Sequence, residues 1–174
     1  MEKKKSTKIV LAIAGVLVVV LAALAVKFFI LDAIKLEVTD SFEGITWDLN
    51  IEQAKRVLER EGYKFETSHN PTKVQLFFIE EFAGYDDISG TGSLVSFEEG
   101  CIENIYIDIK ISENDLSEKE FDKFATAVMD AYESEIGKPV EHEGVYIYSG
   151  ANSTVEIAYF ENSEIMIIFS PPEN

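Results

Sequence analysis

Two histidines, one cysteine and a pair of adjacent aspartates are the side chains of this 174-residue chain that are best suited to catalysis or metal binding. His69 precedes an Asn-Pro turn and His142 lies between two glutamates, so both are expected on the surface. Cys101 follows a Glu-Glu-Gly turn and begins a predicted strand. It is either a half-buried small hydrophobic residue or a thiol that pairs with another chain. No Gly-x-Ser-x-Gly motif accompanies these residues, and no catalytic residue is predicted.

Asp86 and Asp87 lie in the glycine-rich stretch 84–92 and are the strongest metal-ligand candidates. Carboxylate oxygens beside flexible glycines are ligands that Ca²⁺ prefers, and extracellular calcium sites work at millimolar concentration. The stretch lacks the ligand order of an EF-hand. Two interpretations stay open: a weak calcium site with Asp86 and Asp87 as ligands, and a solvated acidic loop. No other cofactor is indicated.

The charge of the chain is unevenly distributed. The formal net charge is −17, yet residues 32–174 carry 10 lysines and arginines against 31 aspartates and glutamates, a net charge of −21. Phosphate binding needs clustered basic side chains, so nucleic acid is excluded as a partner. Hydrophobic residues make up 47% of the chain, which is too many for a disordered protein, and a packed core is expected. One cysteine excludes an internal disulfide framework.

The N-terminal 31 residues have the pattern of a membrane anchor. Four lysines, at positions 3, 4, 5 and 8, precede an uncharged run of 18 residues, 9–26. Such a run is about 27 Å long as a helix, and the apolar residues 28–31 extend it enough to cross a hydrocarbon layer of about 30 Å. The lysines favour a cytoplasmic N-terminus, so we expect a single-pass protein of the cell membrane with its acidic domain outside the cytoplasm.

A secretory signal peptide has the same basic and apolar order. Ala23-Leu24-Ala25 fits the small-residue pattern of a cleavage site. The apolar run is longer than the core of a typical signal peptide, and bulky residues follow the site, which favours an uncleaved anchor. We therefore divide the chain into a basic tip and membrane helix (1–31), a tether (32–44) and an acidic extracytoplasmic domain (45–174).

Two capping boxes predict the helices of the acidic domain. Asn50 with Gln53 opens a helix that ends before Gly62, and Ser117 with Glu120 opens a second helix that ends at Gly137. In the second helix Phe121, Phe124 and Val128, among others, recur at spacings of three and four, so this face is expected in the core.

Runs of β-forming residues fill the rest of the domain at hairpin spacing. The predicted strands cover 63–67, 74–82, 92–97, 102–111, 145–149, 154–160 and 165–169. Strands in series with one helix before each series predict an α+β fold, a two-layer sandwich of an antiparallel sheet with helices on one face. The repeated order suggests an internal duplication, although residue similarity between the halves is slight.

Aromatic residues give the candidates for partner binding. Tyr106, Tyr146 and Tyr148 alternate with aliphatic residues in predicted strands and are expected on the open face of the sheet. An ordinary aromatic ladder between strands explains the same pattern. Trp47, just before the first helix, is either a core residue that closes the helix onto the sheet or an exposed anchor for a partner.

The segments 42–50, 95–100 and 136–139, which read FEGITWDLN, VSFEEG and IGKP, resemble small bacterial extracytoplasmic proteins of the β-lactamase-inhibitor-protein-like and SmpA/OmlA-like α+β type. The likeness covers about residues 42–169. It implies a non-enzymatic binding or assembly module at the cell envelope. The chain lacks the lipobox cysteine of one branch and the disulfides of the other, so neither specific partner is implied.

We therefore predict a membrane-anchored extracytoplasmic module without catalytic activity. Its expected partners are the membrane, through the N-terminal helix, and another envelope protein or surface component. The alternative is a membrane-tethered enzyme or a weak divalent-cation-binding domain. A shallow aromatic sheet face favours the binding module, whereas paired carboxylates in a deep pocket favour the enzyme.

Overall fold

The protein is described by a computed structural model that covers residues 38–67, 70, 72–85, 88–97, 100–160 and 163–172. The predicted membrane anchor, residues 1–31, lies outside these residues. Within the described ranges, no helix is long and apolar enough to cross a membrane.

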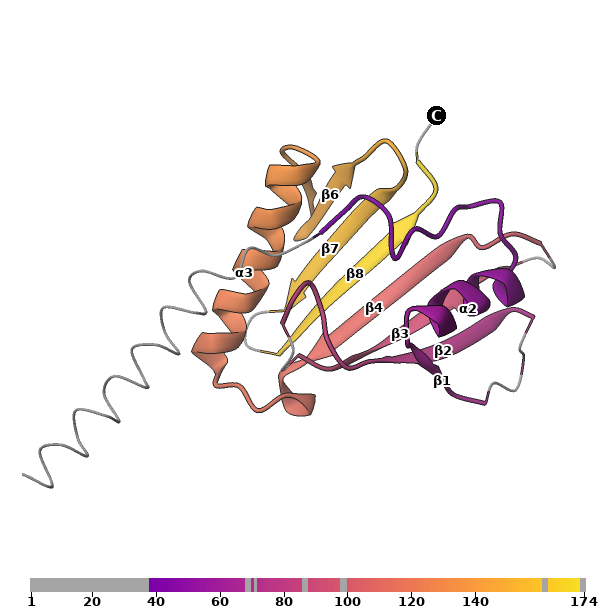
Figure 1. The fold of residues 1–174 in the computed structure, drawn as a ribbon. Coiled ribbons are helices and arrows are strands. Elements are labelled where there is room, and N and C mark those ends of the chain that lie inside the picture. The colour runs from indigo at the N-terminus through magenta and orange to yellow at the C-terminus, as the bar shows by residue number, and fades with distance from the viewer. Residues whose placement is uncertain are drawn as a thin grey trace, which may run out of the picture. The chain divides into compact units, whose positions relative to one another are not determined.

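One antiparallel sheet of eight strands forms the larger layer of the domain (Figure 1). Its spatial order is β1-β2-β3-β4-β8-β7-β6-β5, so two meanders of four strands meet at β4 and β8. The α+β fold with an antiparallel sheet, predicted from the hairpin spacing, is confirmed. The strands are β1 (Lys64–Phe65), β2 (Val74–Ile79), β3 (Gly90–Val95), β4 (Asn104–Lys110), β5 (Val140–His142), β6 (Val145–Ser149), β7 (Thr154–Phe160) and β8 (Glu164–Ser170).

The short edge strand β5 is the one strand of the described sheet that the sequence did not predict. It consists of three exposed residues directly after Pro139, too few for a period-two pattern to stand out. With β5 included, each half of the domain is one helix followed by four strands. The repeated order that suggested a duplication is therefore complete at the level of topology.

The two α-helices begin where the capping boxes predicted. In α2 (Ile51–Arg60), Asn50 Oδ1 accepts from the Gln53 backbone N–H at 2.9 Å, and Gln53 Oε1 accepts from the Asn50 N–H at 3.0 Å. The equivalent pair at Ser117 and Glu120 opens α3 (Glu118–Glu135). A short 3-10 helix, η1 (Ile111–Glu113), lies between β4 and α3. These caps satisfy backbone N–H groups that a helix start leaves without partners.

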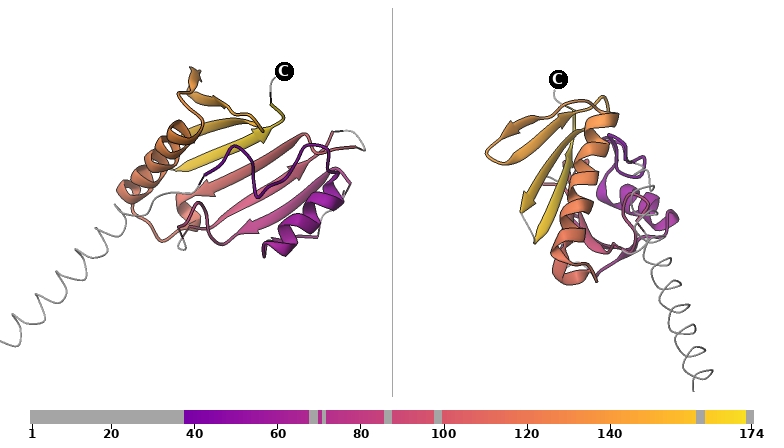
Figure 2. Two further views of the ribbon diagram at one scale, coloured as in Figure 1. Left: turned by 45° about the horizontal axis from the view of Figure 1, so that its top comes forward. Right: turned by 90° about the vertical axis from the view of Figure 1, so that its left-hand side faces the viewer.

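Both helices cover the same face of the sheet (Figure 2). In α3, Tyr132 contacts the rings of Tyr148 and Phe169, with centroids 5.8 and 6.4 Å apart. In α2, the Lys55 ammonium lies 5.2 Å above the ring of Phe65 on β1. The predicted core residues Phe121, Phe124 and Val128 are buried, which confirms the apolar face of α3.

The segment that precedes α2 belongs to the folded domain. Phe42 is buried and its ring lies 5.8 Å from Phe77 and 5.7 Å from Phe169, between the areas that the two helices cover. Asp40 accepts two hydrogen bonds from Asn152, each 2.8 Å long. The stretch from Asp40 to Gly44, which the sequence analysis assigned to the tether 32–44, is therefore fixed to the sheet by a buried aromatic ring and a two-point polar contact, and residues 32–37 lie outside the described residues.

Trp47 packs against the core at the same place. Its side chain is half-buried, and Nε1 donates to the carbonyl of Asn152 at 2.7 Å. Of the two interpretations of Trp47, the structure supports the core residue. The indole and Asp40 thus both bind Asn152 in the turn between β6 and β7.

Candidate functional site

The face of the sheet opposite the helices, here called the open face, is the candidate site. Cross-strand pairing aligns its side chains in two rows. Each row crosses seven strands in the spatial order β2-β3-β4-β8-β7-β6-β5. The first row contains Leu76, Ser93, Tyr106, Ile168, Glu156, Ile147 and Val140. The second row contains Phe78, Thr91, Asp108, Met166, Ala158, Val145 and His142.

The burial of the two faces differs sharply. All residues of both open-face rows are half-buried or exposed. Between the two open-face rows, the strands carry a row whose side chains point to the helices. It runs from Phe77 through Gly92, Ile107 and Ile167 to Ile157, and every one of these residues is buried. The open face therefore has no covering layer among the described residues, although apolar side chains predominate in its first row.

Large apolar side chains are concentrated on this face. Five large hydrophobic residues in the described ranges are exposed, and four of them belong to the open face: Leu76 (41% exposed), Phe78 (46%), Val140 (69%) and Phe160 (52%). Phe160 pairs with Glu164 beyond the second row. The fifth, Phe97 (60% exposed), follows β3 and lies outside both rows. Leu76 and Phe78 lie on β2 and Val140 lies on β5 at the other end of the first row, with half-buried apolar residues of the row between them. Exposed apolar residues that share one face mark an interaction site more often than residues scattered over the surface do.

The size of the open face suits a protein partner. With neighbouring strands about 4.8 Å apart, seven strands span about 30 Å, and all of them except the three-residue β5 have five to seven residues and are about 20 Å long. The projected area is thus roughly 600 Å², comparable to the approximately 800 Å² that one protein contributes to a standard interface.

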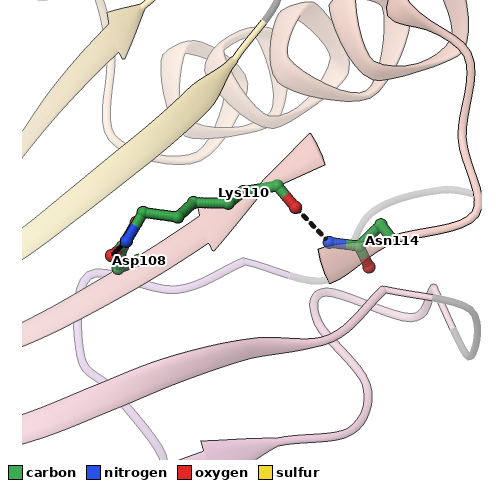
Figure 3. Close-up of polar contacts among 3 residues, drawn as sticks. All are labelled: Asp108, Lys110 and Asn114. Carbon is green, nitrogen blue, oxygen red and sulfur yellow. Dashed lines mark hydrogen bonds and ion pairs between the residues drawn. The ribbon is translucent and has the colours of Figure 1, made fainter. Parts of the chain in front are cut away.

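Carboxylates dominate the charge of the open face. Asp108 forms an ion pair with Lys110 on the same strand (Figure 3). A hydrogen bond with Asp108, together with partial burial, raises the pKa of Glu164 above its usual value. Glu156 has no hydrogen bond or ion pair within the described part of the chain, and it stands between Ile147 and Ile168 in the first row.

Asn114 fixes the end of β4 near this charge cluster. Its Nδ2 donates to the carbonyl of Lys110 at 2.7 Å (Figure 3). The same Nδ2 donates to the carbonyl of Ser89 at 3.0 Å. Its Oδ1 accepts from the Ser89 backbone N–H at 2.7 Å. The amide therefore joins the end of β4 to the start of β3, and it limits movement of the strand that carries Asp108 and Lys110.

The three tyrosines predicted for the open face do not share it. Tyr106 lies there, opposite Ile168. Tyr146 pairs with Ile157 and Tyr148 with Val155, so both belong to the face that the helices cover. The prediction was wrong for these two because valine and isoleucine alternate with tyrosine in β6, and either set of residues suits a core.

Tyr148 has a clear structural role on the helix side. Its ring is buried beside Tyr132, and its hydroxyl donates to the carbonyl of Met129 in α3 at 3.2 Å. Burial, with smaller effects from Glu133 and other nearby groups, raises the pKa of Tyr148 to about 12. Its phenol therefore stays protonated and links α3 to β6.

Sequence reasoning missed the residues that give the open face its apolar character, above all Leu76 and Phe78. A signal for them existed. The strand Val74–Ile79 reads VQLFFI, with apolar residues in both phases of its alternation. Such a strand is either buried on both faces or carries an apolar face that another molecule can cover.

The predicted calcium ligands Asp86 and Asp87 lie outside the described residues. Within the described ranges, no group of three or more His, Cys, Asp or Glu side chains is arranged to hold a metal ion. His142 is exposed on β5, as expected, and His69 lies outside the described residues. Cys101 is exposed, so the half-buried alternative for this residue was wrong.

A cleft of about 710 Å³ lies beside the segment 38–44 that precedes α2. It is lined by Glu43, Glu61, Glu80 and Glu81 together with aromatic residues. Tyr63 donates from its hydroxyl to Glu43 Oε1 at 2.7 Å. Burial, and then this hydrogen bond, raises the pKa of Tyr63 far above its usual value. Tyr63 is therefore a neutral donor that positions Glu43.

Comparisons of the chain with protein-family models, with curated proteins and with solved structures give no match. The geometry of the open face thus carries the functional argument.

Proposed function

We propose that this domain is a non-catalytic binding module that docks a protein partner on its open face. The observation that carries the proposal is the placement of Leu76, Phe78, Val140 and Phe160, four of the five exposed large hydrophobic residues, on that one face. Exposed apolar area costs free energy in water, and a partner that covers it recovers about 25 cal/mol for each Å² removed from water.

The rigidity of the sheet supports the same proposal. Each row is built on paired strands, so its side chains are held in fixed register and lose little backbone entropy when a partner binds. The helices pack on the opposite face, which leaves the open face accessible from one side. A broad, partly apolar sheet surface suits another protein better than a small molecule, which binds in concave pockets.

The proposal includes the location of the domain. The lysines before the apolar run 9–26 support an anchor in the cell membrane with the acidic domain outside the cytoplasm. The expected partner is then another envelope protein or a surface component. Protease added to cells from which the wall has been removed should digest the domain, and full protection would contradict this orientation.

Photocrosslinking in cells that carry the full chain tests the docking face. A benzoylphenylalanine at position 76 or 78 should give one discrete crosslinked product, because both side chains lie on the proposed interface. Phe97 is the matched control, since it is an exposed aromatic residue outside both rows. Equal products from position 97, or none from positions 76 and 78, would contradict the proposal.

A further inference from the structure

The position of Glu156 says what kind of partner the open face accepts. Glu156 is half-buried in the centre of β7, with Ile147 and Ile168 as its cross-strand neighbours. Any partner that covers these two isoleucines must also cover the carboxylate between them. Removing a carboxylate from water without a compensating charge or hydrogen bond costs several kcal/mol.

The open face does not supply that compensating charge itself. Its strands place two lysines on this face, Lys64 and Lys110, and each already forms an ion pair, with Glu80 and Asp108 respectively. Glu156 has no such partner within the described residues. A cation from the partner is therefore the group that makes burial of this row favourable.

A second copy of this chain fits the open face poorly. Residues 32–174 carry a net charge of −21, and each copy would bring the same unpaired carboxylate to the interface. Like charges that face one another across an interface cost several kcal/mol. An uncharged apolar partner would leave Glu156 buried without a counterion.

We infer that the open face binds a protein segment in which an arginine or lysine is flanked by apolar side chains, with the cation on Glu156 and the apolar groups on Ile147 and Ile168. This inference rests on the proposed function, because it names the chemistry of the partner at the same face. Arginine suits the site well, since its planar guanidinium pairs with a carboxylate through two parallel hydrogen bonds and its stem covers apolar surface.

The test measures binding of labelled synthetic peptides to the full chain by fluorescence anisotropy. The first probe is a short peptide in which leucine and arginine alternate. A second replaces arginine with glutamine, and a third replaces leucine with glycine. The protein should bind the leucine-arginine peptide most tightly, because only this peptide matches both the carboxylate and the apolar row.

Two variants with the same change of net charge isolate the role of Glu156. Glu156→Gln should weaken binding of the leucine-arginine peptide by about tenfold or more, the size of effect expected when one partner of a covered charge pair is lost. Glu59→Gln, at an exposed position on α2, should leave binding unchanged. Equal effects of the two variants would overturn the inference, since a general attraction to an acidic protein would then explain the binding. Circular dichroism confirms that both variants are folded.

Other outcomes separate this inference from the proposed function. If the leucine-glutamine peptide binds as tightly as the leucine-arginine peptide and Ile168→Ser, next to Glu156 in the first row, weakens both, the docking face stands and the requirement for a cation is refuted. If Ile168→Ser changes no peptide affinity, both proposals fail. If sedimentation shows a dimer of the unmodified protein that Leu76→Ser dissociates, a second copy is the occupant, and the inference is refuted.

Discussion

Replacing Gly92 with alanine tests the packing of the Phe77 ring on the buried, helix-covered face of the sheet. Gly92 on β3 pairs with Phe77 on β2, and the aromatic ring lies directly over the glycine. A Cβ atom at position 92 would lie 2.7 Å from Cε1 of Phe77 and closer still to Cζ and Cε2. These separations are far inside van der Waals contact, so the ring must move or the strands must separate.

The surroundings of Phe77 oppose such a movement. The side chain is 1% exposed, and the rings of Phe42, Tyr63 and Phe65 lie with centroids 5.8, 5.5 and 5.6 Å from its own. Overpacking a well-filled core costs about 1–3 kcal/mol. We expect Gly92→Ala to lower the free energy of unfolding by that amount.

Urea denaturation followed by the fluorescence of Trp47, the only tryptophan, measures this change. Gly100→Ala is the matched control, because a Cβ atom at this exposed position meets no atom within 4 Å. It should change the free energy of unfolding by less than about 0.5 kcal/mol. A smaller side chain at position 77 should relieve the clash, so Phe77→Leu and Gly92→Ala should cost less together than the sum of their separate effects. Equal stability of the Gly92 and Gly100 variants would refute the reasoning.

Three further predictions concern the core and the titrating groups. Phe124→Ala should lower the free energy of unfolding by about 3–5 kcal/mol in the same urea assay, because the ring is 2% exposed, and a loss below about 1 kcal/mol would show that the site is loosely packed. Partial burial raises the pKa of Asp40, but hydrogen bonds from the Asn152 side chain and from the backbone of Asn152, Ala151 and Asp40 together lower it by more, so its net pKa lies below the usual value. The stabilisation that the ionised Asp40 carboxylate gives the folded state is then complete at neutral pH and lost as the pH falls through this lowered pKa. Asp40→Ala should therefore remove this loss at acid pH from a plot of the free energy of unfolding against pH. The hydrogen bond with Asp108 raises the pKa of Glu164, so the folded state disfavours the ionised form, and stability rises as the pH falls through the raised pKa. Glu164→Gln should therefore stabilise the protein at neutral pH, and an unchanged free energy of unfolding would contradict this.

Much of the fold was predictable because its determinants are local. The capping boxes at Asn50 and Ser117 satisfy helix N–H groups with side chains three residues away, so a short stretch of sequence specifies where each helix begins. The alternation in β4 is equally local, with isoleucines on the helix side and polar residues on the open face. Both features were confirmed.

The open face was less predictable because it depends on the whole sheet. In β6, valine, isoleucine and tyrosine suit either face, and only pairing with Val155 and Ile157 on β7 settles that Tyr146 and Tyr148 face the helices. The hydrogen bonds of Asp40 and Trp47 to Asn152 join residues more than 100 positions apart, which no local pattern reveals. The same reason explains why the isolation of Glu156 between two isoleucines emerged only from the register of three strands.

Hydroxyl-radical footprinting of the protein in intact cells and after purification tests the central claim most directly. Met166 and Tyr106 lie on the open face and react readily with radicals, whereas Phe97 is exposed beyond the end of β3 and outside both rows. A docked partner predicts that Met166 and Tyr106 are protected in cells and become reactive on purification, while labelling of Phe97 stays the same. Equal labelling of Met166 and Tyr106 in the two preparations would contradict the assignment of the open face as a binding surface.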